Sequence, residues 1–191
     1  MLRRGRLLGV MGLIAVLIGL MVIGGAPREV VAQAEPAPAV AAQQPTLPPP
    51  ALPLSEARAI IDGAIARARS RNQSMSVAVL DTGGHIISQD RMDGASFQGT
   101  QLAAGKAMAA LMLRLPTAEL FDWPVTQPDR WFGLHFNFPG QIYTGPGGVP
   151  LTVSGTLVGA AGVSGLPRGQ DDEAIEEGIA AWARIRPGAG H

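Results

Sequence analysis

The clearest hydrophobic pattern lies between residues 75 and 95, where two short apolar runs flank a glycine turn. Met75, Val77 and Val79 alternate with Ser76, Ala78 and Leu80, so that both faces are nearly apolar. This pattern indicates a central strand that is covered on both sides. Gly83 and Gly84 supply the positive φ angles that a tight turn requires, and residues 85–92 return as a second strand. The stretch therefore predicts an antiparallel hairpin.

Helical periodicity surrounds this hairpin. From Ser55, a candidate N-cap, to about Asn72, apolar residues recur along one face opposite several arginines. Residues 96–113 form a second run with two interior glycines, which cost a helix roughly 1 kcal/mol each and so imply close packing against a neighbour. Residues 170–183 form a third run, and its opening acidic residues favour a helix N-terminus.

Two further features complete the folded part. Residues 149–153 and 156–163 are apolar runs joined by Ser-Gly, which predicts another hairpin. Before them lies the aromatic segment (residues 122–141), in which Trp and Phe alternate with prolines, and we expect it to be irregular and loop-like. A lid or oligomer contact and the apolar wall of a ligand pocket both fit its composition. The order of the elements predicts an α+β fold, with an antiparallel sheet covered by helices.

The N-terminal part differs in composition from the rest. Three arginines precede an apolar run at residues 7–26, and Ala-Gln-Ala at residues 32–34 supplies the small residues of a cleavage site. We therefore expect residues 1–34 to be a signal peptide and the protein to be periplasmic or secreted. An uncleaved anchor is the alternative, because the apolar run approaches the roughly 20 residues that span a bilayer. Membrane contact is expected only through such an anchor.

The remaining boundaries follow from composition. Residues 35–53 are rich in Pro and Ala, carry almost no charge and are predicted to be a linker. The folded domain is expected at residues 54–185, followed by a disordered tail at residues 186–191.

Charge and composition exclude several classes of function. The formal net charge is zero, which argues against a nucleic-acid partner because phosphate contacts require a basic surplus. The absence of cysteine excludes disulfides, thiolate metal sites, iron–sulfur clusters and cysteine nucleophiles. No Ser/His/Asp order, His–carboxylate metal spacing or phosphate-binding glycine loop stands out in the sequence.

Several stretches carry a family resemblance. They are VAVLDTGGHIISQDRMDGA, the Lys106-Ala107 pair, GGVPLTVSGTLVGAAGVSG and the acidic start of the last helix. In this order they resemble the GlcG/HbpS family of small haem-binding proteins, also described as haem-degrading and related to the C-terminal domain of PduO, over about residues 54–182. The resemblance implies a profilin-like α/β/α sandwich with a five-stranded antiparallel sheet, frequent homo-oligomerisation and haem binding.

Haem iron takes His, Met, Tyr or Cys ligands, and His135 and His85 are the candidate metal ligands of this chain. His135 lies among aromatic residues suited to a porphyrin face, although local packing explains it equally well. His85 lies beside the glycine turn, where it either faces a groove or is solvated. Tyr143, the only tyrosine, is a further candidate that fits a structural role more readily.

Lys106 is the only lysine and lies in a predicted helix of Ala and Gly, where it must extend to water or meet a carboxylate. Asp93 and Asp81 are its natural partners if the helix packs on the hairpin, and a bridge to Asp93 would have a structural role. Alternatively, Lys106 and Arg91 bind a ligand carboxylate, such as a haem propionate or a small acid.

We therefore expect an exported, homo-oligomeric protein that binds, stores or senses haem or a similar tetrapyrrole without catalysis. One alternative is an enzyme that degrades haem or processes a small organic acid. Another is a ligand-free oligomeric assembly module.

Overall fold

The computed structural model describes residues 51–191. The predicted signal peptide and most of the predicted linker lie outside the described residues. The helices are α1 (Leu54–Ser70), α2 (Gly99–Leu113), α3 (Trp123–Thr126), α4 (Pro128–Asn137) and α5 (Gln170–Ala183), with the short 3-10 helix η1 (Thr117–Leu120). The strands are β1 (Ser76–Leu80), β2 (Ile86–Arg91), β3 (Gly148–Val153), β4 (Thr156–Ser164) and β5 (Ala189–Gly190).

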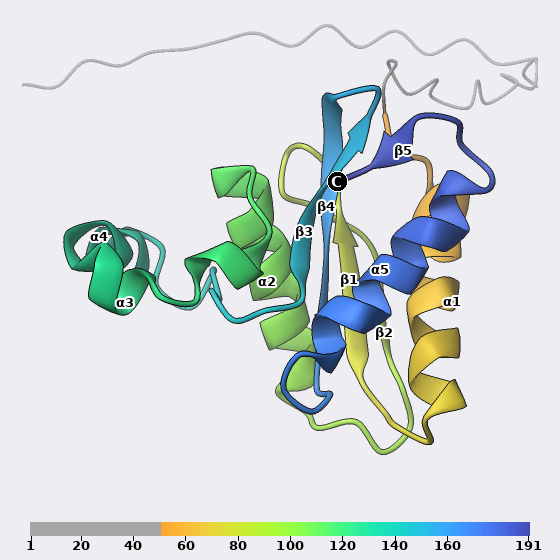
Figure 1. Cartoon of the computed structure of the whole chain (residues 1–191), viewed down its shortest axis with the longest axis horizontal. Helices are drawn as coiled ribbons and strands as arrows, with labels where there is room; N and C mark the ends of the chain where they lie inside the picture. Colours follow the sequence, from red (N-terminus) through yellow and green to blue (C-terminus); the bar gives the residue numbers. More distant parts are fainter. Residues whose placement is uncertain (1–50) are drawn as a thin grey trace, which may run out of the picture. The chain divides into compact units, whose positions relative to one another are not determined.

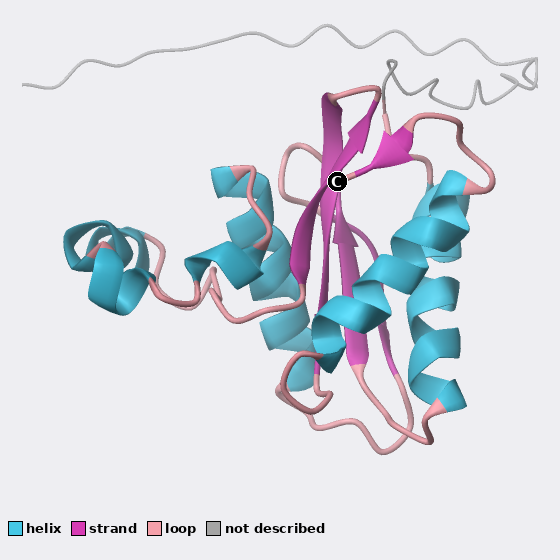
Figure 2. Cartoon of the chain, viewed as in Figure 1, coloured by secondary structure: helices cyan, strands magenta, loops and turns pink. Residues whose placement is uncertain are grey.

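The five strands form one antiparallel sheet in the order β2-β1-β4-β3-β5 (Figures 1 and 2). Helices α1 and α5 cover one face, and α2 covers the other (Figure 1). The α+β class and the five-stranded antiparallel sheet flanked by helices are therefore confirmed.

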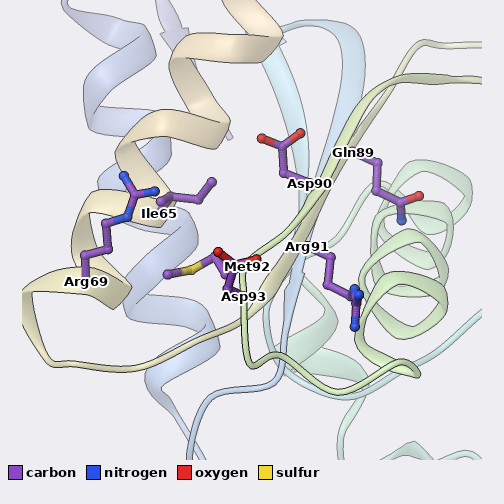
Figure 3. A pocket seen from close by; sticks show the side chains of 7 residues that line it. All are labelled: Ile65, Arg69, Gln89, Asp90, Arg91, Met92 and Asp93. Atoms are coloured by element: carbon purple, nitrogen blue, oxygen red, sulfur yellow. The ribbon is translucent and has the colours of Figure 1, made fainter.

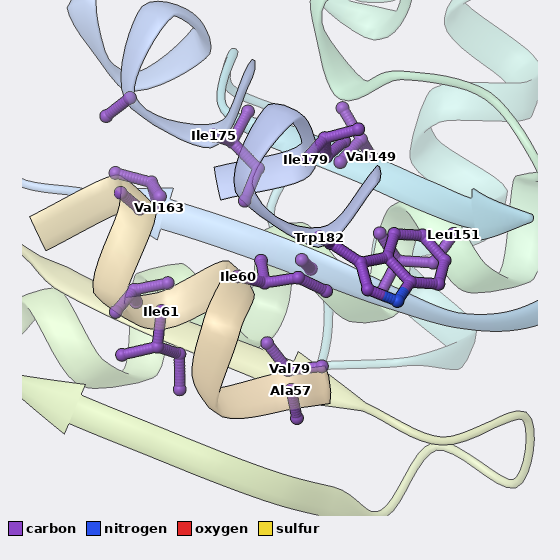
Figure 4. Packing of buried hydrophobic residues seen from close by; sticks show 14 of the residues in the cluster. Ala57, Ile60, Ile61, Val79, Val149, Leu151, Val163, Ile175, Ile179 and Trp182 are labelled. Atoms are coloured by element: carbon purple, nitrogen blue, oxygen red, sulfur yellow. The ribbon is translucent and has the colours of Figure 1, made fainter. Parts of the chain in front are cut away.

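The main core lies between the sheet and the pair α1 and α5 (Figure 4). Its largest fully buried side chain is Trp182, which packs among aliphatic residues such as Ile60 and Leu151. The indole Nε1 of Trp182 donates to Glu56 Oε2 at 2.7 Å, and Arg186 Nη1 donates to the same carboxylate. The polar edge of the indole is thus satisfied where α1 begins and α5 ends.

Most local predictions are confirmed. All five residues of β1 are buried, and β1 lies between β2 and β4, as expected for a central strand. Asn72 adopts the predicted left-handed conformation after α1, with φ of 53°. In the first turn, only Gly84 has a positive φ; Gly83 instead donates its N–H to the Asp81 side chain.

Two predictions about helix boundaries are wrong. Ser55 is not the N-cap of α1, because the helix begins at Leu54 after Pro53, whose carbonyl accepts the first helical N–H bonds. The aromatic segment is not an irregular loop, because it contains α3 and α4. Pro124 and Pro128 occupy the first turns of these helices, where a proline loses no hydrogen bond, so they begin the helices instead of breaking them.

The C-terminal residues take part in the sheet. Ala189 and Gly190 pair with Val153 and Thr152 of β3, where the sequence predicted a disordered tail. A strand of two residues carries too little periodicity to be recognised from sequence.

Glycines allow α2 to lie directly on the sheet. A Cβ at Gly162 of β4 would stand 2.2 Å from the Ala103 carbonyl oxygen, and one at Gly148 of β3 would stand 2.5 Å from the Lys106 carbonyl oxygen. Within α2, Gly105 faces the backbone of Tyr143, whose N–H donates to the Gly105 carbonyl at 3.0 Å. The close packing implied by the helix glycines is therefore present, and it brings the α2 backbone against two strands.

This contact predicts the effect of adding one methyl group. Gly162→Ala should lower the free energy of unfolding by about 3 kcal/mol, because the clash is with backbone and cannot be relieved by a rotamer change. Gly133→Ala is the matched control, since a Cβ there meets nothing within 4 Å and alanine favours the α4 helix by roughly 0.5–1 kcal/mol. Urea unfolding of both variants measures the difference; equal midpoints would contradict the packing described.

Candidate functional site

The predicted site residues fall into four separate places. Lys106 and Tyr143 lie together under the start of α5. His135 lies on α4 in the aromatic segment. The remaining candidates lie at the two ends of β2: His85 at its beginning, Arg91 and Asp93 at its end.

Lys106 makes an ion pair inside the protein. Its Nζ donates to Asp171 Oδ2 at 2.7 Å and to the Val163 carbonyl at 2.8 Å, and only 4% of the lysine side chain is exposed. The other oxygen of Asp171 accepts the N–H of Leu166 at 3.0 Å. This bond network joins α2, the end of β4 and the first turn of α5.

The predicted partners of Lys106 are wrong. Asp81 accepts the turn N–H groups of Gly83 and His85, and Arg91 donates to the Ala95 carbonyl at 3.2 Å. The Asp93 side chain lies with the residues at the end of β2 (Figure 3). Lys106 reaches Asp171 instead because Gly147, next to its Nζ, has no side chain to block that route.

Asp172 adds a second carboxyl group to this cluster. Burial raises the pKa of Asp172, and the negative charge of Asp171 acts in the same direction. The Gly147 N–H and the Lys106 ammonium oppose this rise without cancelling it. The two neighbouring carboxyls therefore differ. Asp171 binds the Lys106 ammonium directly, whereas burial makes the ionised form of Asp172 less favourable.

Tyr143 lies beside the Lys106 ammonium, and Thr117 bonds Gly148, which packs on the Lys106 backbone. The Tyr143 ring is half-exposed, and its centroid is 5.8 Å from Lys106 Nζ, in reach of a cation–π contact. Thr117 is fully buried. Its Oγ1 donates to the Gly145 carbonyl at 2.7 Å and accepts the Gly148 N–H at 2.8 Å. Thr117 and Asp171 were missed by sequence reasoning, because their partners are distant in the chain and no spacing marks them.

His85 is a surface residue of the β1–β2 turn. Its side chain is 83% exposed, and its Nδ1 lies 3.4 Å from Asp81 Oδ1. Within residues 51–191, its ring stacks on no aromatic side chain and adjoins no apolar cluster. The turn therefore offers a solvated imidazole, not an enclosed ligand site.

His135 has a defined orientation on α4. Its Nδ1 lies 2.9 Å from the carbonyl oxygen of Trp131, one turn earlier, and the two rings are 4.2 Å apart between centroids. A carbonyl only accepts, so Nδ1 carries the proton, and in the neutral ring Nε2 keeps its lone pair. Nε2 is therefore the atom available to a metal.

The outer face of α4 is apolar and exposed. Phe132 and Phe136, one turn apart, are 63% and 86% exposed, and His135 lies at the border between their face and the side that carries Trp131, against which its ring packs. The opposite side, with Trp131, Leu134 and Phe138, packs against a small cluster that includes Trp123. The structure thus presents an imidazole beside two exposed aromatic rings, on a helix held from behind.

Two other features are absent from the described residues: a cluster of metal-binding side chains and a membrane-spanning helix. Between residues 51 and 191, no three His, Asp or Glu side chains converge in a way that could hold a metal ion. No helix of that part is both long and apolar enough to cross a bilayer.

Comparisons with known proteins identify relatives. Residues 52–180 match the family model described as "Haem degrading protein HbpS-like". The corrinoid adenosyltransferase PduO of Salmonella typhimurium is 31% identical over 134 residues, which is 70% of this chain but only 39% of PduO.

Solved structures agree with this family. The crystal structure of a PduOC:haem complex superposes with a TM-score of 0.63 at 31% identity, covering 69% of this chain and 94% of that one. The crystal structure of a double mutant of HbpS from Streptomyces reticuli gives a TM-score of 0.62 at 30% identity, covering 77% of this chain and 96% of that one.

The Lys106 cluster predicts different effects on stability for its two carboxyls. Asp171→Asn should lower the free energy of unfolding by about 3 kcal/mol at neutral pH, because it leaves a buried ammonium without its counter-charge. Asp172→Asn should not destabilise the protein at that pH, because it removes a carboxylate whose ionisation burial opposes. Thermal unfolding of the two variants beside the unchanged chain tests this pairing; a larger loss in Asp172→Asn would refute it.

The same carboxyl predicts a pH dependence. The folded pKa of Asp172 lies above its unfolded value, so the folded state binds more protons between the two. The contribution of Asp172 to stability is therefore present at low pH and is lost as pH rises through the folded pKa. The Tm of Asp172→Asn minus that of the unchanged chain should increase with pH from about 4 upward, whereas a flat difference would show that Asp172 titrates normally.

Proposed function

The chain belongs to the HbpS-like family of haem-degrading proteins, and on this basis we propose that it binds haem on the exposed face of α4, with His135 as an axial ligand. The observation that carries the proposal is the orientation of His135. The hydrogen bond from Nδ1 to the Trp131 carbonyl fixes the ring and leaves Nε2 for iron, the arrangement by which proteins set the tautomer of a metal-binding histidine.

The surroundings of His135 suit a flat apolar ligand. Phe132 and Phe136 lie next to it on the exposed side of α4 and offer aromatic surface to a porphyrin. Burying an exposed phenylalanine side chain stabilises a complex by about 1.5–3 kcal/mol. A porphyrin that covers these rings would therefore gain binding free energy in addition to that from iron coordination. When bound, haem would supply the redox-active iron, and the chain would supply the ligand and the apolar contact.

Other predicted ligands have different roles in this proposal. Lys106 is engaged by Asp171 and Val163, so we assign it to the fold and not to a haem propionate. His85 is solvated in its turn and serves as the comparison histidine. Tyr143, half-exposed beside Lys106, is kept as a packing residue.

A hemin titration tests the proposal. The unchanged chain should give a Soret shift on adding hemin, and His135→Ala should lose that shift or raise the Kd by about tenfold or more. His85→Ala should keep it, since that imidazole has no apolar surface beside it. Phe136→Ala should keep the shift with a Kd raised about three- to tenfold, less than full burial of the side chain would give, because a flat porphyrin covers only one face of the ring.

The outcomes separate the alternatives. Equal binding by His135→Ala and the unchanged chain would refute the assigned ligand. A shift lost only in His85→Ala would move the site to the β1–β2 turn. No shift in any variant would favour a ligand-free assembly module.

A second candidate, haem degradation, is favoured by the description of the family model. Under this alternative, hemin bound to the chain should bleach and release iron when a reductant and oxygen are supplied. Stable absorbance of bound hemin under these conditions would instead support binding, storage or sensing. The same assay in His135→Ala asks whether any bleaching depends on the proposed ligand.

We further propose that the protein is exported, on the basis of its arginines, apolar run and Ala-Gln-Ala sequence before residue 35. N-terminal sequencing of protein recovered from the periplasm or medium should begin at Glu35. Protein that begins at Met1 and sediments with membranes would support the anchor instead.

A further inference from the structure

Strand β2 is an edge of the sheet with little protection. The sheet order places β2 at one end, and its six residues include neither proline nor lysine, which commonly block edges. Its two charged residues, Asp90 and Arg91, are held within the chain by Arg58 and the Ala95 carbonyl, and the irregularity of its ladder lies at the other end of the strand, opposite Leu80. The opposite edge differs, because β3 contains Pro150 and is partly covered by β5. An edge with free backbone groups is a template for pairing with another strand.

The direction of the free backbone groups follows from the ladder. Met92 N–H donates to the Met75 carbonyl at 3.0 Å, so Met75 and Met92 form a hydrogen-bonded pair. Hydrogen-bonded pairs alternate with non-hydrogen-bonded pairs along an antiparallel ladder, so the backbone of Asp90 also bonds to β1. The backbone N–H and C=O groups of Gln89 and Arg91 therefore point away from the sheet.

A cavity of about 420 Å³ lies along this edge and is lined by Ile65, Arg69 and residues 89–93. The side chains of Gln89 and Arg91 point away from α1 (Figure 3), where they bond the carbonyls of Thr100 and Ala95. These two residues therefore border the cavity with their backbone, and the cavity lies between α1 and the end of β2.

One side chain on this strand lacks a partner. Ser88 is buried, and its Oγ has no hydrogen bond among the described residues. It shares the α1 side of β2 with Asp90, since their ladder partners Val79 and Val77 both belong to the core under α1. Asp90 is held at the surface by Arg58 at 2.8 Å. A buried hydroxyl without an acceptor is costly unless assembly supplies one.

We propose that β2 pairs antiparallel with β2 of a second copy of this chain, across a two-fold axis at Gln89. In this register Gln89 lies opposite Gln89, and Ser88 lies opposite Asp90 of the second copy, so the unpartnered hydroxyl gains a carboxylate acceptor. Both copies gain the same contact, which is the self-complementarity a two-fold interface requires. An axis at Arg91 would instead set two guanidinium groups opposite each other, which is destabilising.

The absence of cysteine makes the register directly testable. In the full chain, Gln89→Cys should form a disulfide-linked dimer under mild oxidation with diamide, because directly opposed residues in a hydrogen-bonded pair have Cα atoms about 5.5 Å apart. Arg91→Cys should not, because the two cysteines would be about four residues apart along the strands, or roughly 13 Å.

A second pair of variants tests the backbone contact in the Gln89→Cys background. Arg91→Pro removes an outward N–H that is not bonded to β1. In the proposed dimer this N–H makes one hydrogen bond in each copy, so its loss should slow cross-linking about tenfold. Arg91→Ala loses the same side chain but keeps the N–H and should cross-link at the original rate.

The results divide clearly. Cross-linking at position 89 but not 91 supports the interface. Cross-linking at 91 as fast as at 89, or at neither position, overturns it. If Arg91→Pro fails to fold by circular dichroism, the comparison of the two single cysteine variants still decides.

Discussion

The ion pair between Lys106 and Asp171 joins the layers of this protein. A buried ammonium is unfavourable unless an anion and hydrogen-bond acceptors surround it, so Lys106 can be buried only if α5 begins where Asp171 meets it and β4 ends with the Val163 carbonyl in reach. Helix α2 lies on one face of the sheet and α5 on the other. The pair therefore sets the positions of two helices relative to the end of one strand, and Gly147 and Gly162 leave the space that it needs.

The aromatic segment depends on this arrangement. The residues on either side of it are anchored near Lys106: the Thr117 hydroxyl accepts the N–H of Gly148 at the start of β3, and the Tyr143 N–H donates to the Gly105 carbonyl. Trp131 also reaches the Thr144 hydroxyl. These contacts hold α4 by its inner side and leave Phe132 and Phe136 uncovered. The surface proposed for haem thus lies on a segment whose flanking residues are bonded to the sheet and to α2.

The predictability of these features from sequence follows the range of the interactions. The hairpins and the three long helices were predicted because alternation, periodicity and turn residues act over a few positions. The partner of Lys106 was not, because Asp171 lies 65 positions away and other acidic residues, such as Asp93, are nearer in sequence. The helices of the aromatic segment were hidden because proline breaks a helix interior but suits a first turn, and sequence alone did not show which position each proline takes. His135 was identified by its aromatic neighbours, but the bond that orients it exists only once α4 has formed.

The two proposed surfaces lie on different parts of the sheet, which bears on how the protein would use them. The aromatic segment is anchored beside β3, whereas the free edge is β2, and β1 and β4 separate these strands. Pairing of two β2 edges would therefore leave both α4 surfaces uncovered. Two ligands influence each other only through a difference in the states that they favour. Because two strands separate these surfaces and no residue belongs to both, we expect a β2-paired dimer to carry two independent haem sites.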